Sequence, residues 1–90
     1  MTQKQVDYWD QANSFQLRME DECSEAVREG KLGEFERKLE DLELRLSNEP
    51  WFRDARPVAQ EVTLKCLRRD IRRMIRNYRL DEAALAACFG

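Results

Sequence analysis

Histidine is absent from this 90-residue chain, and glycine (3 residues) and proline (2 residues) are scarce. Without histidine the chain lacks the commonest general base, the usual proton switch and the most frequent metal ligand, which excludes most enzymes and mixed His/Cys zinc sites. The shortage of turn-forming residues argues against a protein of many strands. No apolar run of about 18 residues occurs, and Met1–Gln5 lacks the apolar core of a signal peptide, so we expect a cytoplasmic protein without a membrane span.

Cysteine is present but sparse, at Cys23, Cys66 and Cys88. The odd count and the spacings of 43 and 22 residues match no disulfide framework and no zinc motif. Three reduced thiols that pack as small hydrophobic side chains are the favoured interpretation. A redox switch or an intermolecular disulfide is the alternative.

Hydrophobic side chains recur at helical spacing along nearly the whole chain. The intervals are three or four residues over 2–29, 32–46 and 57–79, and the strong helix formers of 81–89 predict a further short helix. At 10.8 kDa the chain accommodates one domain, over residues 1–90. We predict an all-α fold, in which an antiparallel helical hairpin is followed by a third long helix and a short C-terminal helix.

The first predicted helix is long for a chain of this size. About 27 residues of helix extend roughly 40 Å at 1.5 Å per residue, whereas a compact chain of this length has a radius of gyration near 12 Å. Either this helix bends at Asn13 and Ser14, or a second copy of the chain covers the part that protrudes. The second alternative is favoured, so we expect a homodimeric helical bundle.

The formal net charge of −2 conceals a separation of charge along the chain. Residues 1–49 carry a net charge of −6, whereas residues 65–79 carry +6, from Lys65, Arg68, Arg69, Arg72, Arg73, Arg76 and Arg79 against Asp70. This basic stripe has three interpretations: pairing with the acidic helices within the bundle or across a dimer, an acidic protein partner, or the phosphates of a nucleic acid. The sequence pI of 5.2 and the lack of a helix-turn-helix signature make nucleic acid the least favoured of them.

Two groups of apolar side chains are further candidates for binding. Trp51 and Phe52 follow Pro50 at a corner between predicted helices, where they either plug the end of the bundle or anchor a protein partner. Leu85 and Phe89 in the predicted C-terminal helix dock either on their own bundle or in a groove of another protein.

No arrangement of residues indicates catalysis. The carboxylates lie on helix faces among Lys and Arg rather than in a dry cleft, and Cys23 and Cys66 fall on apolar faces with no histidine to activate them. Gly30 and Gly33 match no phosphate-binding loop. We therefore expect no enzymatic activity, no cofactor and no metal.

In size, helical-hairpin pattern, lack of catalytic residues and expected dimerisation, the chain is similar to small bacterial helical regulators that act by sequestration. Among these are the anti-activators that trap LuxR-type quorum-sensing transcription factors, and small secretion chaperones share the same character. The resemblance is one of general character, so no functional residue carries over from it. It implies a protein that binds a receptor and blocks its dimer or its DNA contacts.

We therefore predict a non-enzymatic regulator that binds another protein, such as a transcription factor, and sequesters or inhibits it. Nucleic-acid binding through the helix of residues 65–79 and a secretion-type chaperone are the alternatives. The predicted protein-binding residues are Trp51, Phe52, Leu85, Phe89, Arg69, Arg72, Arg73 and Arg76.

Overall fold

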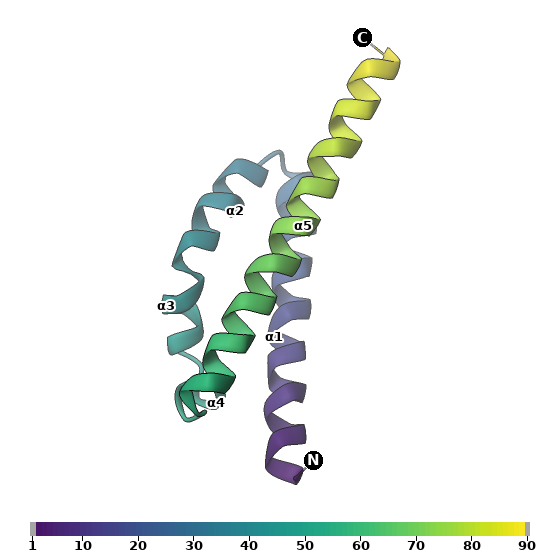
Figure 1. Cartoon of the computed structure of the whole chain (residues 1–90). Helices are drawn as coiled ribbons and strands as arrows, with labels where there is room; N and C mark the ends of the chain where they lie inside the picture. The colour runs from purple at the N-terminus through teal and green to yellow at the C-terminus, as the bar shows by residue number, and fades with distance from the viewer. Residues whose placement is uncertain (1, 90) are drawn as a thin grey trace.

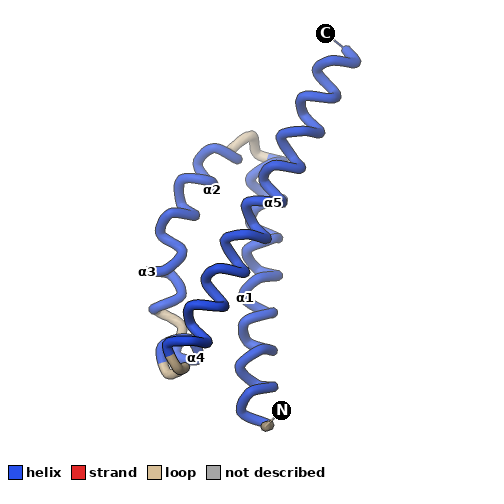
Figure 2. Tube along the Cα trace, viewed as in Figure 1, coloured by secondary structure: helices blue, strands red, loops and turns tan. Residues whose placement is uncertain are grey.

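The protein consists of helices and short connections over residues 2–89, which are the residues that this computed structural model describes, with side chains through Cys88. The helices in chain order are α1 (Gln3–Arg28), α2 (Leu32–Lys38), the 3₁₀ turn η1 (Leu39–Asp41), α3 (Leu42–Ser47), α4 (Pro50–Arg53) and α5 (Pro57–Phe89). No strand occurs among residues 2–89, so the predicted all-α class is confirmed. Figure 2 shows the connections as short loops between long stretches of helix.

Local sequence signals set both ends of α1. The Thr2 hydroxyl accepts a hydrogen bond from the Gln5 backbone N–H, and the Gln5 side chain accepts one from the Thr2 backbone N–H, which completes a capping box. At the other end Gly30 has a φ of 71°, a left-handed conformation that glycine adopts without strain, and the chain reverses there. Between these ends α1 continues through Asn13 and Ser14, so the bend considered at these residues is absent.

The helix that was predicted over 32–46 is divided into α2 and α3 by the η1 turn. Its apolar side chains keep their spacing across the turn, and all of the regularly spaced ones are buried: Leu32, Phe35, Leu39, Leu42 and Leu46. Leu44 falls outside this spacing and is 67% exposed. The turn therefore changes the hydrogen bonding of the segment without changing the face that it buries.

The C-terminal third of the chain differs from the prediction. We expected a third helix over 57–79 and a separate short helix over 81–89, but α5 continues without interruption from Pro57 to Phe89. The residues after Pro57 include no further proline and no glycine before the helix ends, and the alanine-rich last turns have high helix propensity. At 1.5 Å per residue the 33 residues of α5 extend about 50 Å.

Helices α1 and α5 run in the same direction, and the segment α2–α3 runs in the opposite direction (Figure 1). Three side-chain hydrogen bonds show how α1 and α5 are aligned lengthwise: Tyr8 with Thr63, Gln16 with Asp70, and Ser24 with Tyr78. The paired residues are 55, 54 and 54 positions apart in the chain. The offset changes by only one residue, which shows that the two helices run side by side in the same direction along their shared length. Together with α2–α3 they enclose a core whose largest fully buried side chains are Phe15, Leu42, Leu46 and Ile71.

The molecule is elongated because α5 is longer than the bundle. Its principal extents are 53 × 24 × 18 Å and its radius of gyration is 15.5 Å, against about 12 Å for a compact chain of this length. The last turns of α5 project beyond α1 and α2 (Figure 1), and every described side chain from Leu80 to Cys88 is exposed. We refer to residues 80–89 as the overhang.

Candidate functional site

Trp51 and Phe52 of α4 lie at the end of the bundle where α5 begins, which is the lower end in Figure 1. Phe52 is 6% exposed and belongs to the core, and Trp51 is half-buried against it. The Trp51 ring makes edge-to-face contacts with Tyr8 and Phe15 of α1, with ring centroids 5.4 and 6.1 Å apart. The burial of Phe52 favours the interpretation of a plug that closes the end of the bundle over that of an anchor for a protein partner.

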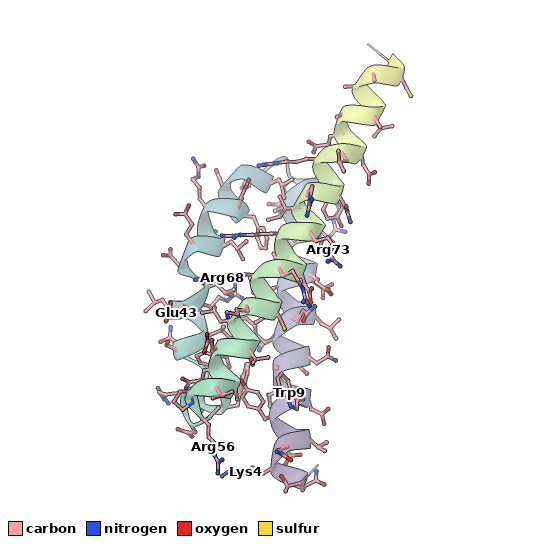
Figure 3. All side chains as sticks on the ribbon, in the orientation of Figure 1. Lys4, Trp9, Glu43, Arg56, Arg68 and Arg73 are labelled. Carbon is pink, nitrogen blue, oxygen red and sulfur yellow. The ribbon has the colours of Figure 1, made fainter. Side chains whose placement is uncertain are left out.

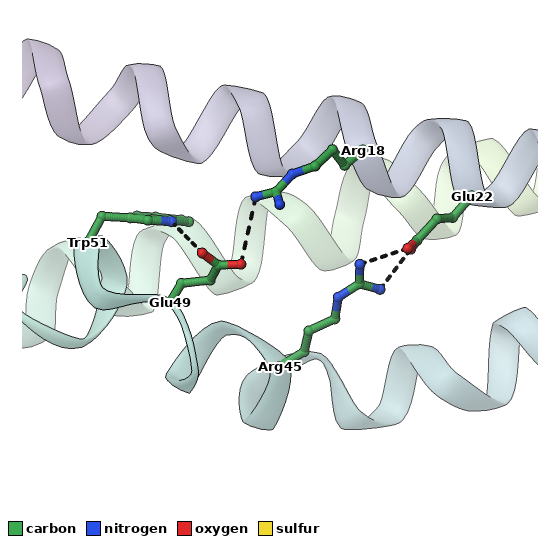
Figure 4. A network of polar contacts seen from close by, with 5 residues as sticks. All are labelled: Arg18, Glu22, Arg45, Glu49 and Trp51. Carbon is green, nitrogen blue, oxygen red and sulfur yellow. Dashed lines mark hydrogen bonds and ion pairs between the residues drawn. The ribbon is translucent and has the colours of Figure 1, made fainter.

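A set of polar contacts next to this plug ties α1 to α3 and α4 (Figure 4). Arg45 of α3 donates two hydrogen bonds to the Glu22 carboxylate of α1, at 2.7 and 2.8 Å. This bidentate contact lowers the pKa of Glu22 below its ordinary value. Glu49 accepts a hydrogen bond from the Trp51 indole at 3.2 Å and lies 3.7 Å from the Arg18 guanidinium. These charged groups serve the fold rather than an open site.

Pairing within the structure accounts for only part of the basic stripe on α5. Arg79 forms an ion pair with Glu36 of α2, Arg69 pairs with its neighbour Asp70, and Lys65 pairs with Glu61 one turn earlier. Asp70 raises the pKa of Arg69 through a hydrogen bond. Among the described side chains, no ion pair within 4 Å involves the four other arginines of the stripe: Arg68, Arg72, Arg73 and Arg76.

Two of these arginines line a groove between α5 and the α2–η1 segment, which we call the arginine groove. Arg72, Arg76 and Arg79 supply its basic wall, and the apolar side chains Leu39, Ile75 and Leu80 supply its floor and end. Glu36 and Glu40 stand on the opposite side, and the groove has a volume of about 470 Å³. Because Glu36 is already paired with Arg79, Arg72 and Arg76 are the guanidinium groups that remain for a bound molecule.

The predicted binding residues do not all lie on one surface. Arg68 and Arg73 point to opposite sides of α5 (Figure 3). Arg73 lines a smaller groove of about 230 Å³ between α5 and α1, together with Glu20, Asp70 and Tyr78. The two grooves thus divide the arginines: Arg72 and Arg76 line the arginine groove and Arg73 lines the smaller one. Arg69 lines neither groove and lies seven residues before Arg76, on the same side of α5.

The overhang begins where the arginine groove ends. Leu80 is 61% exposed at the end of the groove, and Leu85 is 59% exposed further along α5. Leu85 continues the heptad spacing of the buried face, seven residues after Tyr78, but no helix of the bundle reaches it. The side chain of Phe89 lies outside the described residues.

The remaining reactive groups form no site. Burial raises the pKa of the Cys23 thiol, and all three cysteines are free. In the described part of the chain no three side chains of the metal-binding types converge, and no helix is long and apolar enough to cross a membrane.

Comparison with known proteins gives no relative for this chain: no family model, no curated protein and no solved structure matches it. The candidate site therefore depends on the residues alone. The sequence did not predict that Leu39, Ile75 and Leu80 line the arginine groove, because a groove between two helices depends on how the helices pack. Leu39 falls on the regular hydrophobic spacing of 32–46 and Ile75 lies beside that of 57–79, and these positions only predict burial.

Proposed function

We propose that this protein is a non-enzymatic regulator that binds an acidic amphipathic helix of another protein in the arginine groove and along the overhang. The observation that carries this proposal is the pair of unpaired guanidinium groups, Arg72 and Arg76, beside the exposed Leu80. Carboxylates of a bound helix would accept charge-assisted hydrogen bonds from these arginines. The apolar face of that helix would cover the exposed Leu80 and Leu85, and burying an apolar helix face in a groove is a common mode of helix recognition.

The mechanism that we propose is steric. A helix held in the groove is withdrawn from the interface that it forms in its own protein, so the target is sequestered or inhibited. A cytoplasmic transcription factor is the target expected from the resemblance to anti-activators, and a secreted protein held by a secretion-type chaperone is the alternative. Neither role needs a cofactor or a metal.

Nucleic acid is a poorer match for this surface. The arginines diverge around α5, and carboxylates flank them on both sides: Glu36 and Glu40 beside Arg72 and Arg76, and Glu20 and Asp70 beside Arg73. A duplex presents phosphates at regular spacing and would meet these carboxylates as well as the arginines. An amphipathic helix suits the groove better, because it can place its carboxylates beside Arg72 and Arg76 and uncharged side chains beside Glu36 and Glu40.

The test is a tagged pull-down from the native cytoplasm, with and without nuclease, using the double variant Arg72→Glu/Arg76→Glu. The matched control is Arg53→Glu/Arg56→Glu, which reverses two exposed arginines that precede α5, at the end of the bundle away from the groove. The proposal expects one protein that survives nuclease, is kept by the control and is lost with the groove variant. Partners that disappear with nuclease, or that both variants retain equally, would overturn it.

We further propose that the protein acts as a homodimer. Its accessible surface is 6736 Å², whereas a compact monomer of this mass exposes about 5500 Å². The excess of about 1200 Å² includes the exposed overhang, and it is larger than the area of about 800 Å² that each partner buries in a standard interface. Sedimentation of the wild-type chain tests this point, and a mass of twice 10.8 kDa is expected.

A further inference from the structure

We propose that a second copy of this chain binds on the face that α1 and α5 form opposite α2–α3, and that α1 of each copy packs against α5 of the other. This inference rests on the proposed homodimer and is independent of the arginine groove. It follows from the side chains exposed on this face, from the net charges of α1 and α5, and from the lengthwise alignment of these two helices.

The side chains of this face are identified by their neighbours in the α1–α5 contact. Tyr8 and Gln16 of α1 contact Thr63 and Asp70 of α5. Take a residue of one helix that contacts a residue of a parallel helix. The side chain one position after the first residue and the side chain one position before the second then point to the same side of the helix pair. These residues are Trp9, Leu17, Val62 and Arg69. The opposite side holds Phe15 and Ile71, which are buried against α2–α3, so the face in question points away from the core.

This face is apolar at one end. Trp9 is 41% exposed, Val62 is 43% exposed and Leu17 is 54% exposed. Val6 and Cys66 lie one helical turn from Trp9 and Val62 and are half-buried. Together these five side chains are the α1/α5 face, an apolar strip without a covering element in one copy. A contiguous exposed strip of this kind marks an interaction surface.

The net charges of the two helices favour one symmetric arrangement. Helix α1 carries six acidic and three basic side chains, a net charge of −3. Helix α5 carries seven basic and four acidic side chains, a net charge of +3. A two-fold axis across the helices would place α1 on α1 and α5 on α5, like charge on like charge. A two-fold axis along the helices places α1 of each copy over α5 of the other, which brings opposite charges together.

The same arrangement preserves the level of each residue along the bundle. A rotation about an axis along the helices does not shift residues lengthwise, so each α1 residue meets the α5 residue about 54 positions later in the other copy. Trp9 of the second copy therefore reaches the level of Val62 and Thr63. Glu20 of the second copy reaches the level of Arg73, one of the arginines without an ion pair. Both contacts occur twice in the dimer.

The first test uses Val62→Glu, with Leu44→Glu as its matched control. Val62 is partly exposed on the α1/α5 face, and Leu44 is 67% exposed on α3. A carboxylate buried within the apolar strip is expected to raise the dissociation constant of the dimer more than about 100-fold. In sedimentation equilibrium, wild type and Leu44→Glu should have twice the 10.8 kDa mass of one chain, and Val62→Glu the mass of one chain. Helical circular dichroism shows whether each variant folds.

A pair of charge reversals tests which helices meet. Glu20→Arg and Arg73→Glu each place like charges across the proposed interface, so each variant alone should dimerise weakly. Mixing the two restores opposite charges at both contacts, so a heterodimer should form. The proposed face is wrong if a folded Val62→Glu remains as dimeric as Leu44→Glu, and the pairing of α1 with α5 is wrong if the mixture stays monomeric. A wild-type chain that is monomeric at every concentration overturns the homodimer itself and leaves the arginine groove to its own test.

Discussion

Two regions were expected to bind a partner: the aromatic corner, formed by Trp51 and Phe52 of α4, and the arginines of the arginine groove. The two regions differ in the side chains that surround them. At the corner, Trp51 packs against Tyr8, Phe15 and Phe52, and Phe52 is 6% exposed. In the groove, Arg72 and Arg76 have no ion pair among the described side chains, and Leu80 is 61% exposed. A chain of this size has a thin core, so it needs its largest aromatic side chains for the fold. Charged side chains are costly to bury, and they stay available to a partner.

The largest effect is expected at the corner. Phe52→Ala removes a buried ring and leaves a cavity at the closed end of the bundle, so it should lower the free energy of unfolding by about 3–5 kcal/mol. Leu44→Ala, at a side chain that is 67% exposed, is the control and should stay within about 0.5 kcal/mol of wild type. Urea denaturation at one fixed protein concentration measures both changes. Equal losses in the two variants would show that Phe52 does not close the bundle.

A smaller effect is expected for the ion pair that joins α1 to α3. Arg45→Ala should lower the free energy of unfolding at neutral pH by about 0.5–1 kcal/mol, because Glu22 and Arg45 are both partly exposed and solvent screens their attraction. The folded pKa of Glu22 is lowered, so this contribution is present above the ordinary carboxyl pKa near 4.5 and is lost as the pH falls through the folded pKa. The difference between wild type and Arg45→Ala should therefore shrink in acid. A difference that stays constant from pH 7 to about pH 3 would contradict this assignment.

The smallest effect on stability is expected in the groove. Arg72→Ala/Arg76→Ala removes two guanidinium groups that pair with nothing in the described structure, so the free energy of unfolding should change by less than about 0.5 kcal/mol. Thermal unfolding followed by circular dichroism is sufficient to detect a larger change. A loss comparable to that of Arg45→Ala would mean that these arginines stabilise the fold, and the contrast with the corner would disappear.

Much of the fold could be predicted from the sequence, because hydrophobic side chains recur at helical spacing along most of the chain. The spacing of Leu32, Phe35 and Leu39 predicts the buried face of α2 and η1. The 3₁₀ turn at Leu39–Asp41 could not be predicted, since the hydrophobic spacing is unbroken there. The continuity of α5 was missed because Asp81 was interpreted as the capping residue of a separate helix over 81–89. Charged residues are compatible with a helix interior where that part of the helix is exposed.

The candidate site could be predicted only in part. The basic stripe is visible in the sequence, but its division between two sides of α5 depends on where α1 and α2 pack. Glu36 forms an ion pair with Arg79 and not with Arg72 or Arg76. This choice of partner depends on the lengthwise position of α2 relative to α5, which the sequence does not give. Trp51 and Phe52 have the composition of a binding hot spot as well as that of a core, and composition alone does not separate these roles.

The most direct test of the account is site-specific photo-crosslinking in the native cells, with a photoreactive residue at position 80 in one strain and at position 44 in another. Leu80 and Leu44 are similarly exposed, at 61% and 67%, but only Leu80 lines the arginine groove. We predict that position 80 yields one covalent product containing this chain and a second, different protein, and that position 44 does not yield it. The same product from both positions, or from position 44 alone, would contradict the assignment of the arginine groove as the partner surface.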